Sequence, residues 1–148
     1  MGDTQPEASF HLAHCAWPKD GPALSAVRCA VFVDEQGVPE SLELDEYDTV
    51  SHHVLVRDRT GKPVGAGRIK PDGQIGRMAV LKDWRGRGIG SAMLAALLEH
   101  ARRQRHTRVF LHAQSSALSF YERAGFTVDG PVFEAAGILH RCMVKTLE

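Results

Sequence analysis

Three closely spaced glycines, Gly86, Gly88 and Gly90, separate two segments of opposite character. The residues before them, 74–81, have the length and apolar content of a buried strand. After them we expect a helix from about Gly88 to Gln104, because its apolar residues recur at helical spacing. These apolar residues form one stripe: Met93, Leu94, Leu97, Leu98 and Ala101. A strand, a glycine-rich turn and an amphipathic helix therefore follow one another.

Such a turn brings the backbone close to whatever lies above the start of the helix. The N–H groups of a first helical turn have no partner within the helix, and the helix dipole favours a negative group there. Arg85 and Arg87 add positive charge at the same place. The stretch therefore predicts a cradle for a diphosphate, formed by Arg85, Gly86, Arg87, Gly88, Ile89, Gly90 and Ser91.

Three known phosphate cradles can be compared with this stretch. The P-loop requires a lysine after its last glycine, and none is present. The dinucleotide fingerprint fails at its third glycine and lacks the acidic residue about 20 positions later. The third pattern, R/Q-x-x-G-x-G/A, is satisfied by Arg85, Gly88 and Gly90. With the preceding Arg77-Met-Ala-Val80, it resembles the coenzyme A loop of the GCN5-related N-acetyltransferase superfamily.

A second motif lies downstream in the order and at the separation that this superfamily shows. The sequence Gln114-x-x-Ala-x-x-Phe-Tyr121-x-x-x-Gly-Phe126 is similar to the family's N/Q-x-x-A-x-x-F-Y-x-x-x-G-F element. The resemblance covers roughly residues 51–145. It implies an α+β fold with a mostly antiparallel sheet, in which a β-bulge splays two central parallel strands apart. The helices flank this sheet.

The resemblance also implies a donor and a mechanism. Acetyl-CoA would lie with its diphosphate in the cradle and its pantetheine along Met78, Ala79 and Val80, with Gln114 as a further binding residue. An amine would attack the thioester directly, the N–H of Val80 would polarise the carbonyl, and Tyr121 would protonate the departing thiolate. Without the resemblance, Tyr121 would be read as a core aromatic residue.

An alkylamine is protonated at neutral pH, so acyl transfer needs a proton acceptor. The run from Val31 to Pro39 and the late His-x-x-Met, residues 140–143, look like the ElaA/YjcF-type branch of the superfamily. The candidates for acceptor binding or for the base are Glu35, Gln36, Asp45, Asp48, His53 and His140. His52 and His53 fall on opposite faces of a strand, and the branch pattern favours His53. His100, His106 and His112 are expected outside the groove, and no metal-binding arrangement of histidines occurs.

The charges are balanced in total, 18 basic against 18 acidic, but they are segregated along the chain. Residues 34–48 carry only acidic charges, whereas residues 82–108 are mainly basic. The basic segment surrounds the cradle. The acidic segment lies where family members build the acceptor side, which predicts a small or cationic amine acceptor.

The remaining patterns complete a single-domain prediction for residues 1–148. Further strands are expected at 10–16, 53–56, 64–69, 109–112, 126–128 and 138–147, and further helices at 23–32 and 116–123. Gly37 and Pro39 limit the acidic segment to a loop with at most short turns. Gly125 is the expected stop of the second of these helices.

Composition excludes several other classes. No apolar run is long enough to span a bilayer, the polar N-terminus lacks a secretory pattern, and three dispersed cysteines indicate reduced thiols in a cytoplasmic protein. Zero net charge argues against a nucleic-acid partner. A catalytically idle acyl-CoA-binding module stays an alternative to the enzyme. A homodimer is possible, but no sequence feature decides it.

Overall fold

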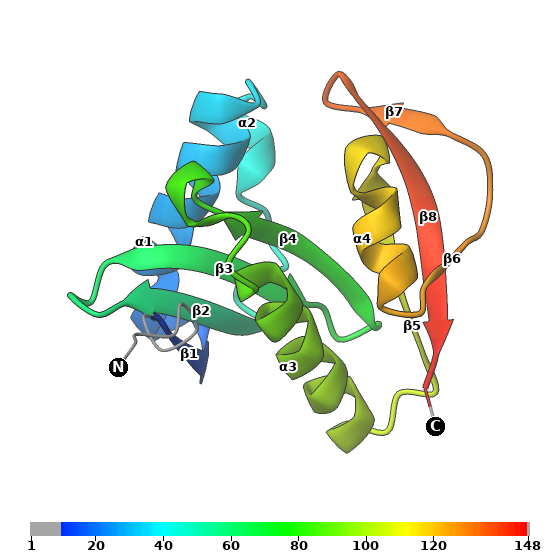
Figure 1. Ribbon diagram of the computed structural model, residues 1–148, viewed down its shortest axis with the longest axis horizontal. Coiled ribbons are helices and arrows are strands. Elements are labelled where there is room, and N and C mark those ends of the chain that lie inside the picture. Colours follow the sequence, from blue (N-terminus) through cyan, green and yellow to red (C-terminus); the bar gives the residue numbers. More distant parts are fainter. Residues whose placement is uncertain (1–9, 148) are drawn as a thin grey trace, which may run out of the picture.

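The computed structural model describes residues 10–147, and its centre is one sheet with the strand order β1-β2-β3-β4-β5-β8-β6 (Figure 1). Residues 1–9, where the polar N-terminal segment falls, and Glu148 lie outside the described residues. Strand β7 pairs with β8 beside this path, and only the β4–β5 pair is parallel. The strands are β1 (Phe10–Cys15), β2 (His52–Asp58), β3 (Pro63–Ile69), β4 (Gln74–Val80), β5 (Arg108–Gln114), β6 (Thr127–Val128), β7 (Phe133–Ala135) and β8 (Ile138–Thr146).

Helices lie on both faces of the sheet, so there are two hydrophobic cores. Helix α3 (Ile89–Arg103) packs against β2, β3 and β4 with the predicted apolar stripe buried. Helix α4 (Leu118–Arg123) contacts β5 and ends before Gly125, which has a positive φ of 96°. Helix α1 (Trp17–Arg28) covers the opposite face of β2, β3 and β4. Within residues 10–147, no such helix lies over the opposite face of β5 and β8 (Figure 1).

The first helix begins six residues earlier than the sequence predicts and runs on as a π-helix, Cys29–Glu35. Pro18 occupies the first turn, where a missing N–H costs nothing, and Pro22 is accommodated inside the helix. Gly37, with a φ of 76°, follows the end of this segment. Beyond it, α2 (Glu40–Glu43) is a single short turn, as predicted for the acidic segment.

Strands β4 and β5 diverge directly after their first two pairs, Gln74 with Phe110 and Ile75 with Leu111. The β3–β4 register shifts in this region, and Arg77 has the left-handed φ of 50° that marks a bulge. In Figure 1 the molecule opens at this point, with β1–β4 on one side and β5, β8 and α4 on the other. The predicted α+β fold with a bulged splay between two parallel strands is confirmed.

The β7–β8 hairpin includes a strand, β7, that the sequence patterns do not predict. Its turn consists of Ala136 and Gly137, both with positive φ, which is the geometry of a two-residue hairpin turn. Alanine in the first position gives little sequence signal for such a turn. Within residues 10–147, no helix combines the length and apolarity needed to cross a membrane.

Candidate active site

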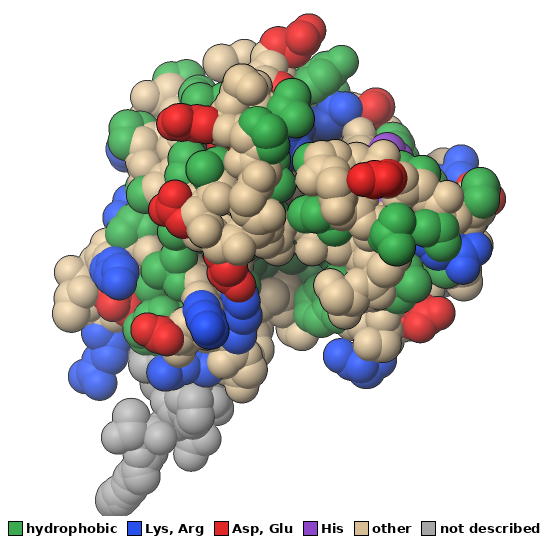
Figure 2. Space-filling model, turned by 90° about the horizontal axis from the view of Figure 1, so that it is seen from above, with side chains coloured by type: hydrophobic (Ala, Val, Ile, Leu, Met, Phe, Trp, Pro, Cys, Tyr) green, Lys and Arg blue, Asp and Glu red, His purple; other side chains and the backbone are tan. Residues whose placement is uncertain are grey.

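Two adjoining cavities occupy the opening between β4 and β5. The first, about 290 Å³, lies on the side of the helix α3 N-terminus, and its lining includes Val80, Arg85 and Gly90. The second, about 430 Å³, lies between the π-helix–α2 segment and the β7–β8 hairpin. Both are lined by Gln36, Met78, Ala117 and Tyr121. We call them the donor-side and the acceptor-side cavity. Seen from above, hydrophobic side chains border the hollow between the two halves (Figure 2).

The predicted cradle forms the beginning of α3. Gly86 and Gly88 have φ values of 78° and 85°, and a Cβ at either would meet open space. The first intrahelical bond runs from the N–H of Ala92 to the carbonyl of Gly88, at 3.0 Å. The three preceding N–H groups, those of Ile89, Gly90 and Ser91, therefore have no partner within the helix. No side chain caps them, so the geometry fits an anionic group at this end.

Arg85 is held against the donor-side cavity by two partners. Its Nε donates to the carbonyl of Val80 at 3.0 Å, and its two terminal nitrogens bind both carboxylate oxygens of Glu35 at 2.7 Å. The hydrogen bonds from Arg85 lower the pKa of Glu35. The structure thus brings Glu35, a candidate for the acceptor side, to the cradle instead.

The backbone of β4 is open along the splay. The N–H of Leu81 donates to the carbonyl of Val64 at 2.9 Å, so Leu81 and Val64 are a hydrogen-bonded pair between β4 and β3. In an antiparallel ladder, hydrogen-bonded pairs alternate with pairs that are not hydrogen-bonded. Val80 and Gly65 are the next pair, so the N–H of Val80 points away from β3. The N–H of Val80 therefore faces the opening, where β5 has already diverged.

Tyr121 lies at the junction of the two cavities. It is half-buried, with Phe120 and Phe126 edge-on to its ring at 5.0 and 5.9 Å. Within residues 10–147 its hydroxyl makes no hydrogen bond of standard geometry to the protein. Burial raises the pKa of Tyr121 to about 12, so the phenol is protonated throughout the neutral range.

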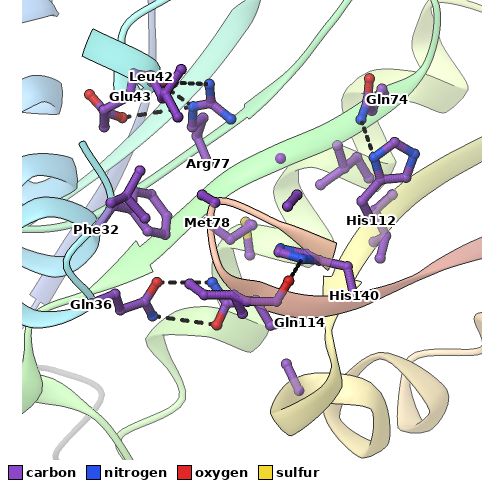
Figure 3. Close-up of a pocket in the computed structure, with 18 of the residues that line it drawn as sticks. Phe32, Gln36, Leu42, Glu43, Gln74, Arg77, Met78, His112, Gln114 and His140 are labelled. Atoms are coloured by element: carbon purple, nitrogen blue, oxygen red, sulfur yellow. Dashed lines mark hydrogen bonds and ion pairs between the residues drawn. The ribbon is translucent and has the colours of Figure 1, made fainter. Parts of the chain in front are cut away.

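The side-chain amides of Gln36 and Gln114 bind each other across the groove beside Tyr121. Gln114 donates to Gln36 Oε1 at 2.9 Å, and Gln36 donates to Gln114 Oε1 at 3.4 Å (Figure 3). The pair joins the residue after the π-helix to the end of β5. Gln36 and Gln114, predicted for different subsites, thus lie together between the two cavities.

Three carboxylates of the acidic segment, Glu43, Asp45 and Asp48, are paired with arginines, so they do not form the open acidic mouth from which a cationic acceptor was predicted. Arg28, which is 1% exposed, binds Glu43 and Asp48, and Arg68 binds Asp45 and Asp48 at 2.7 and 2.8 Å. The hydrogen bonds from Arg68 lower the pKa of Asp45 to about 2. Burial opposes ionisation of Asp48, but bonds from both arginines outweigh it and lower its pKa. Asp45 and Asp48 therefore neutralise buried arginines and do not line either cavity.

His52 and His53 do face opposite sides of β2, and neither lines a cavity. His53 is 1% exposed, lies against Trp17 and binds the carbonyl of Asp48 at 2.8 Å. Burial lowers its pKa. His52 stacks on His100 at 3.6 Å and contacts His14. The preferred base candidate therefore occupies a packed position under α1, which the branch pattern alone could not show.

Two histidines line the acceptor-side cavity, His140, which the sequence proposes, and His112, which it places outside the groove (Figure 3). The expectation for His112 was wrong because β5 and β8 leave this face without a covering helix. Alternation along β5 puts His112 on the same face as Gln114, and Gln114 is paired with His140 of β8. That alternation is the sequence signal that could have found it. Among the described residues, no group of three His, Cys, Asp or Glu side chains could hold a metal ion.

Comparison with known proteins identifies the family of this chain. The family model described as an acetyltransferase (GNAT) domain matches residues 21–147. The chain belongs to the GNAT family. Within this GNAT family, it is 40% identical over 123 residues to the uncharacterized N-acetyltransferase YjcF of Bacillus subtilis, an alignment that covers 80% of this chain and 87% of YjcF.

Solved GNAT structures agree with the fold. The crystal structure of Escherichia coli ElaA has a TM-score of 0.81 at 28% identity, covering 92% of this chain and 99% of ElaA. An acyl-CoA N-acyltransferase from Pseudomonas aeruginosa has a TM-score of 0.83 at 29% identity, covering 93% and 100%. These similarities support the ElaA/YjcF-like branch of the GNAT family.

Proposed function

We propose that this GNAT protein transfers an acetyl group from acetyl-CoA to a primary amine in a ternary complex. The observation that carries the proposal is the junction of the two cavities, where the open N–H of Val80 and the hydroxyl of Tyr121 lie beside one groove. The donor-side cavity lies next to the cradle, and the acceptor-side cavity lies on the other side of Tyr121. Donor and acceptor can therefore meet at this junction from opposite sides.

The donor side fits coenzyme A by its chemistry. The unpaired N–H groups of Ile89, Gly90 and Ser91 would hold the diphosphate, with Arg87 nearby to balance its charge. The pantetheine amides would pair with the open edge of β4, from Met78 to Val80, as an added strand does. Gln114, at the end of β5, would contact the same chain from the other side of the splay.

The chemistry is a direct displacement. The amine nitrogen forms a bond to the thioester carbon, and the N–H of Val80 stabilises the negative charge that develops on the carbonyl oxygen. One such donor is typically worth about 3 kcal/mol of the barrier. The carbon–sulfur bond then breaks, and Tyr121 gives its proton to the leaving sulfur. The raised pKa of Tyr121 keeps that proton available.

The amine must lose a proton, and His140 is the residue that we propose to accept it. Its Nδ1 lies 2.8 Å from the carbonyl of Ile138. A carbonyl only accepts, so Nδ1 carries the hydrogen and Nε2 keeps its lone pair. His140 lines the acceptor-side cavity, whereas His53 does not.

Release of free thiol from acetyl-CoA, measured across a panel of primary amines with each product identified by mass, tests the proposal. An acetylated amine formed together with stoichiometric thiol is the expected result. Calorimetry with acetyl-CoA distinguishes the enzyme from the alternative, a module that binds acyl-CoA without catalysis. Binding heat with no thiol release for any amine would favour that module, and no heat at all would overturn both assignments.

A further inference from the structure

The acceptor-side cavity has apolar walls on two opposite sides. Phe32, Val38 and Leu42 come from the π-helix–α2 segment, and Phe133 and Ile138 come from the β7–β8 hairpin. A cavity of about 430 Å³ with such walls has the size and character of a small-molecule site. The walls are thus suited to contact with an apolar substituent of a ligand, and less suited to a ligand with several charged groups.

The charged residues of this cavity are already compensated. Glu43 is 2% exposed, and its carboxylate binds Arg28 and lies 3.8 Å from Nε of Arg77, which Figure 3 shows beside it. Arg77 donates to the carbonyls of Glu43 and Leu42 and lies 3.2 Å from Asp45. A second ammonium or a carboxylate on the acceptor would therefore find no unpaired residue of opposite charge in this cavity. It would lose hydration on binding without gaining an ion pair.

Three aromatic rings form a continuous wall in the cavity. The ring of Phe133 stacks on His140, with centroids 5.6 Å apart and planes 19° apart. Its edge meets the ring of His112 at 5.2 Å and 82°. Such a wall favours a flat or branched apolar group on the ligand, since aromatic contacts add to the burial of area.

Two imidazoles and the amide of Gln74 supply polar groups beside the aromatic wall. The amide nitrogen of Gln74 approaches His112 Nδ1 at 3.5 Å, and Lys70 fixes the orientation of that amide by donating to its oxygen at 2.9 Å. Nδ1 of His112 therefore accepts, and its other nitrogen carries the hydrogen. His140 presents the opposite arrangement, with Nε2 as an acceptor. The two imidazoles thus offer one acceptor for an amine and one donor.

We propose that the acceptor is a primary amine carried on an uncharged aromatic or branched apolar group, and this rests on the proposed acyl transfer. The amine meets His140, and its substituent lies on the wall formed by Phe133 and the opposite side chains of Phe32 and Leu42. Polyamines, lysine-like diamines and amino acids are the classes that this cavity disfavours.

Matched amine pairs test the substrate class. Phenylethylamine and phenylalanine differ by one carboxylate, and hexylamine and 1,6-diaminohexane differ by one ammonium. We expect the uncharged member of each pair to have a kcat/KM at least about tenfold higher, because the charged member loses hydration without gaining a counter-charge. A diamine or an amino acid that equals or exceeds its partner would overturn the inference but leave acyl transfer intact. Failure of all amines to release thiol would instead remove the proposed function.

A variant pair tests the wall itself. Phe133→Ala should lower kcat/KM for phenylethylamine at least about tenfold more than it lowers kcat/KM for methylamine, which cannot reach the wall. Val132→Ala, which truncates the 51% exposed neighbouring side chain, is the control and should change neither. An equal loss for both amines in Phe133→Ala would contradict a role in selecting the substituent.

Discussion

Gln36 and Gln114 donate to each other's side-chain oxygens although 78 positions separate them in sequence. Each glutamine side chain donates one hydrogen bond and accepts one, so loss of either side chain removes both bonds. The pair fixes the distance between the π-helix and the end of β5 at the point where the two cavities meet. The width of the groove at Tyr121 therefore depends on a contact between the end of the π-helix and the end of β5.

Removal of this pair should weaken donor binding without abolishing it. A net hydrogen bond is worth about 0.5–1.5 kcal/mol, so Gln36→Ala should raise the KM for acetyl-CoA roughly two- to tenfold. Gln36→Glu keeps an acceptor for the 2.9 Å bond from Gln114 and should lie between wild type and Gln36→Ala. Initial-rate kinetics with saturating amine would measure this order, and an unchanged KM in Gln36→Ala would show that the pair has no such role.

Tyr121→Phe should leave binding of acetyl-CoA within about twofold of wild type and lower kcat roughly 100-fold, because it removes a proposed general acid but keeps the ring. Tyr47→Phe is a matched control, since Tyr47 is 42% exposed and lines neither cavity. Calorimetry and single-turnover rates check the two parts separately. A full rate in Tyr121→Phe would show that the acid is another group.

The pH profile should carry a second signature of Tyr121. An acid is active while it is protonated, and burial raises the pKa of this phenol to about 12. Deprotonation of Tyr121 should therefore cause no loss of kcat between pH 7 and about pH 10, a range in which an ordinary phenol begins to ionise. A basic limb within that range that disappears in Tyr121→Phe would contradict the assignment.

His140 and His53 should respond to substitution in opposite ways. His140→Gln removes the proposed proton acceptor and should lower kcat by about 10²-fold or more with little change in Tm. His53→Gln disturbs a buried ring that binds the carbonyl of Asp48, so it should lower Tm and leave kcat per folded molecule near wild type. Thermal unfolding and active-site-normalised rates distinguish the two. The reverse pattern would restore His53 as the candidate base.

The neutralised acidic cluster predicts a large effect on stability. Arg28→Met removes the closest cation from Glu43 and one of the two arginines that bind Asp48. Because both carboxylates are almost fully buried, the variant should destabilise the fold by about 3–5 kcal/mol. Arg103→Met is the control, because its i,i+4 pair with Glu99 is exposed and such pairs contribute at most about 1 kcal/mol. Urea unfolding measures both, and equal midpoints for the two variants would refute the structural role of the cluster.

Sequence patterns alone determine the parts of this protein that are built from neighbouring residues. The stripe of α3, the glycines of the cradle and the run around Tyr121 each define local geometry, because helix spacing and left-handed glycines act within a few positions. The strand patterns likewise place β3 and β4 within a residue or two. The glycine turn and the start of α3 could therefore be predicted to within about one residue.

Only the tertiary structure decides which charged and titratable groups reach the cavities. Glu43, Asp45 and Asp48 look free in sequence, but Arg28 and Arg68 approach them from α1 and β3 and neutralise them. His53 was expected to face the groove, but α1 covers the face of β2 that carries it. His112 was expected outside the groove, but it lines the acceptor-side cavity, because no helix among residues 10–147 covers its face of β5. Burial and ion pairing are properties of the packed layers, and residues that are distant in sequence create them.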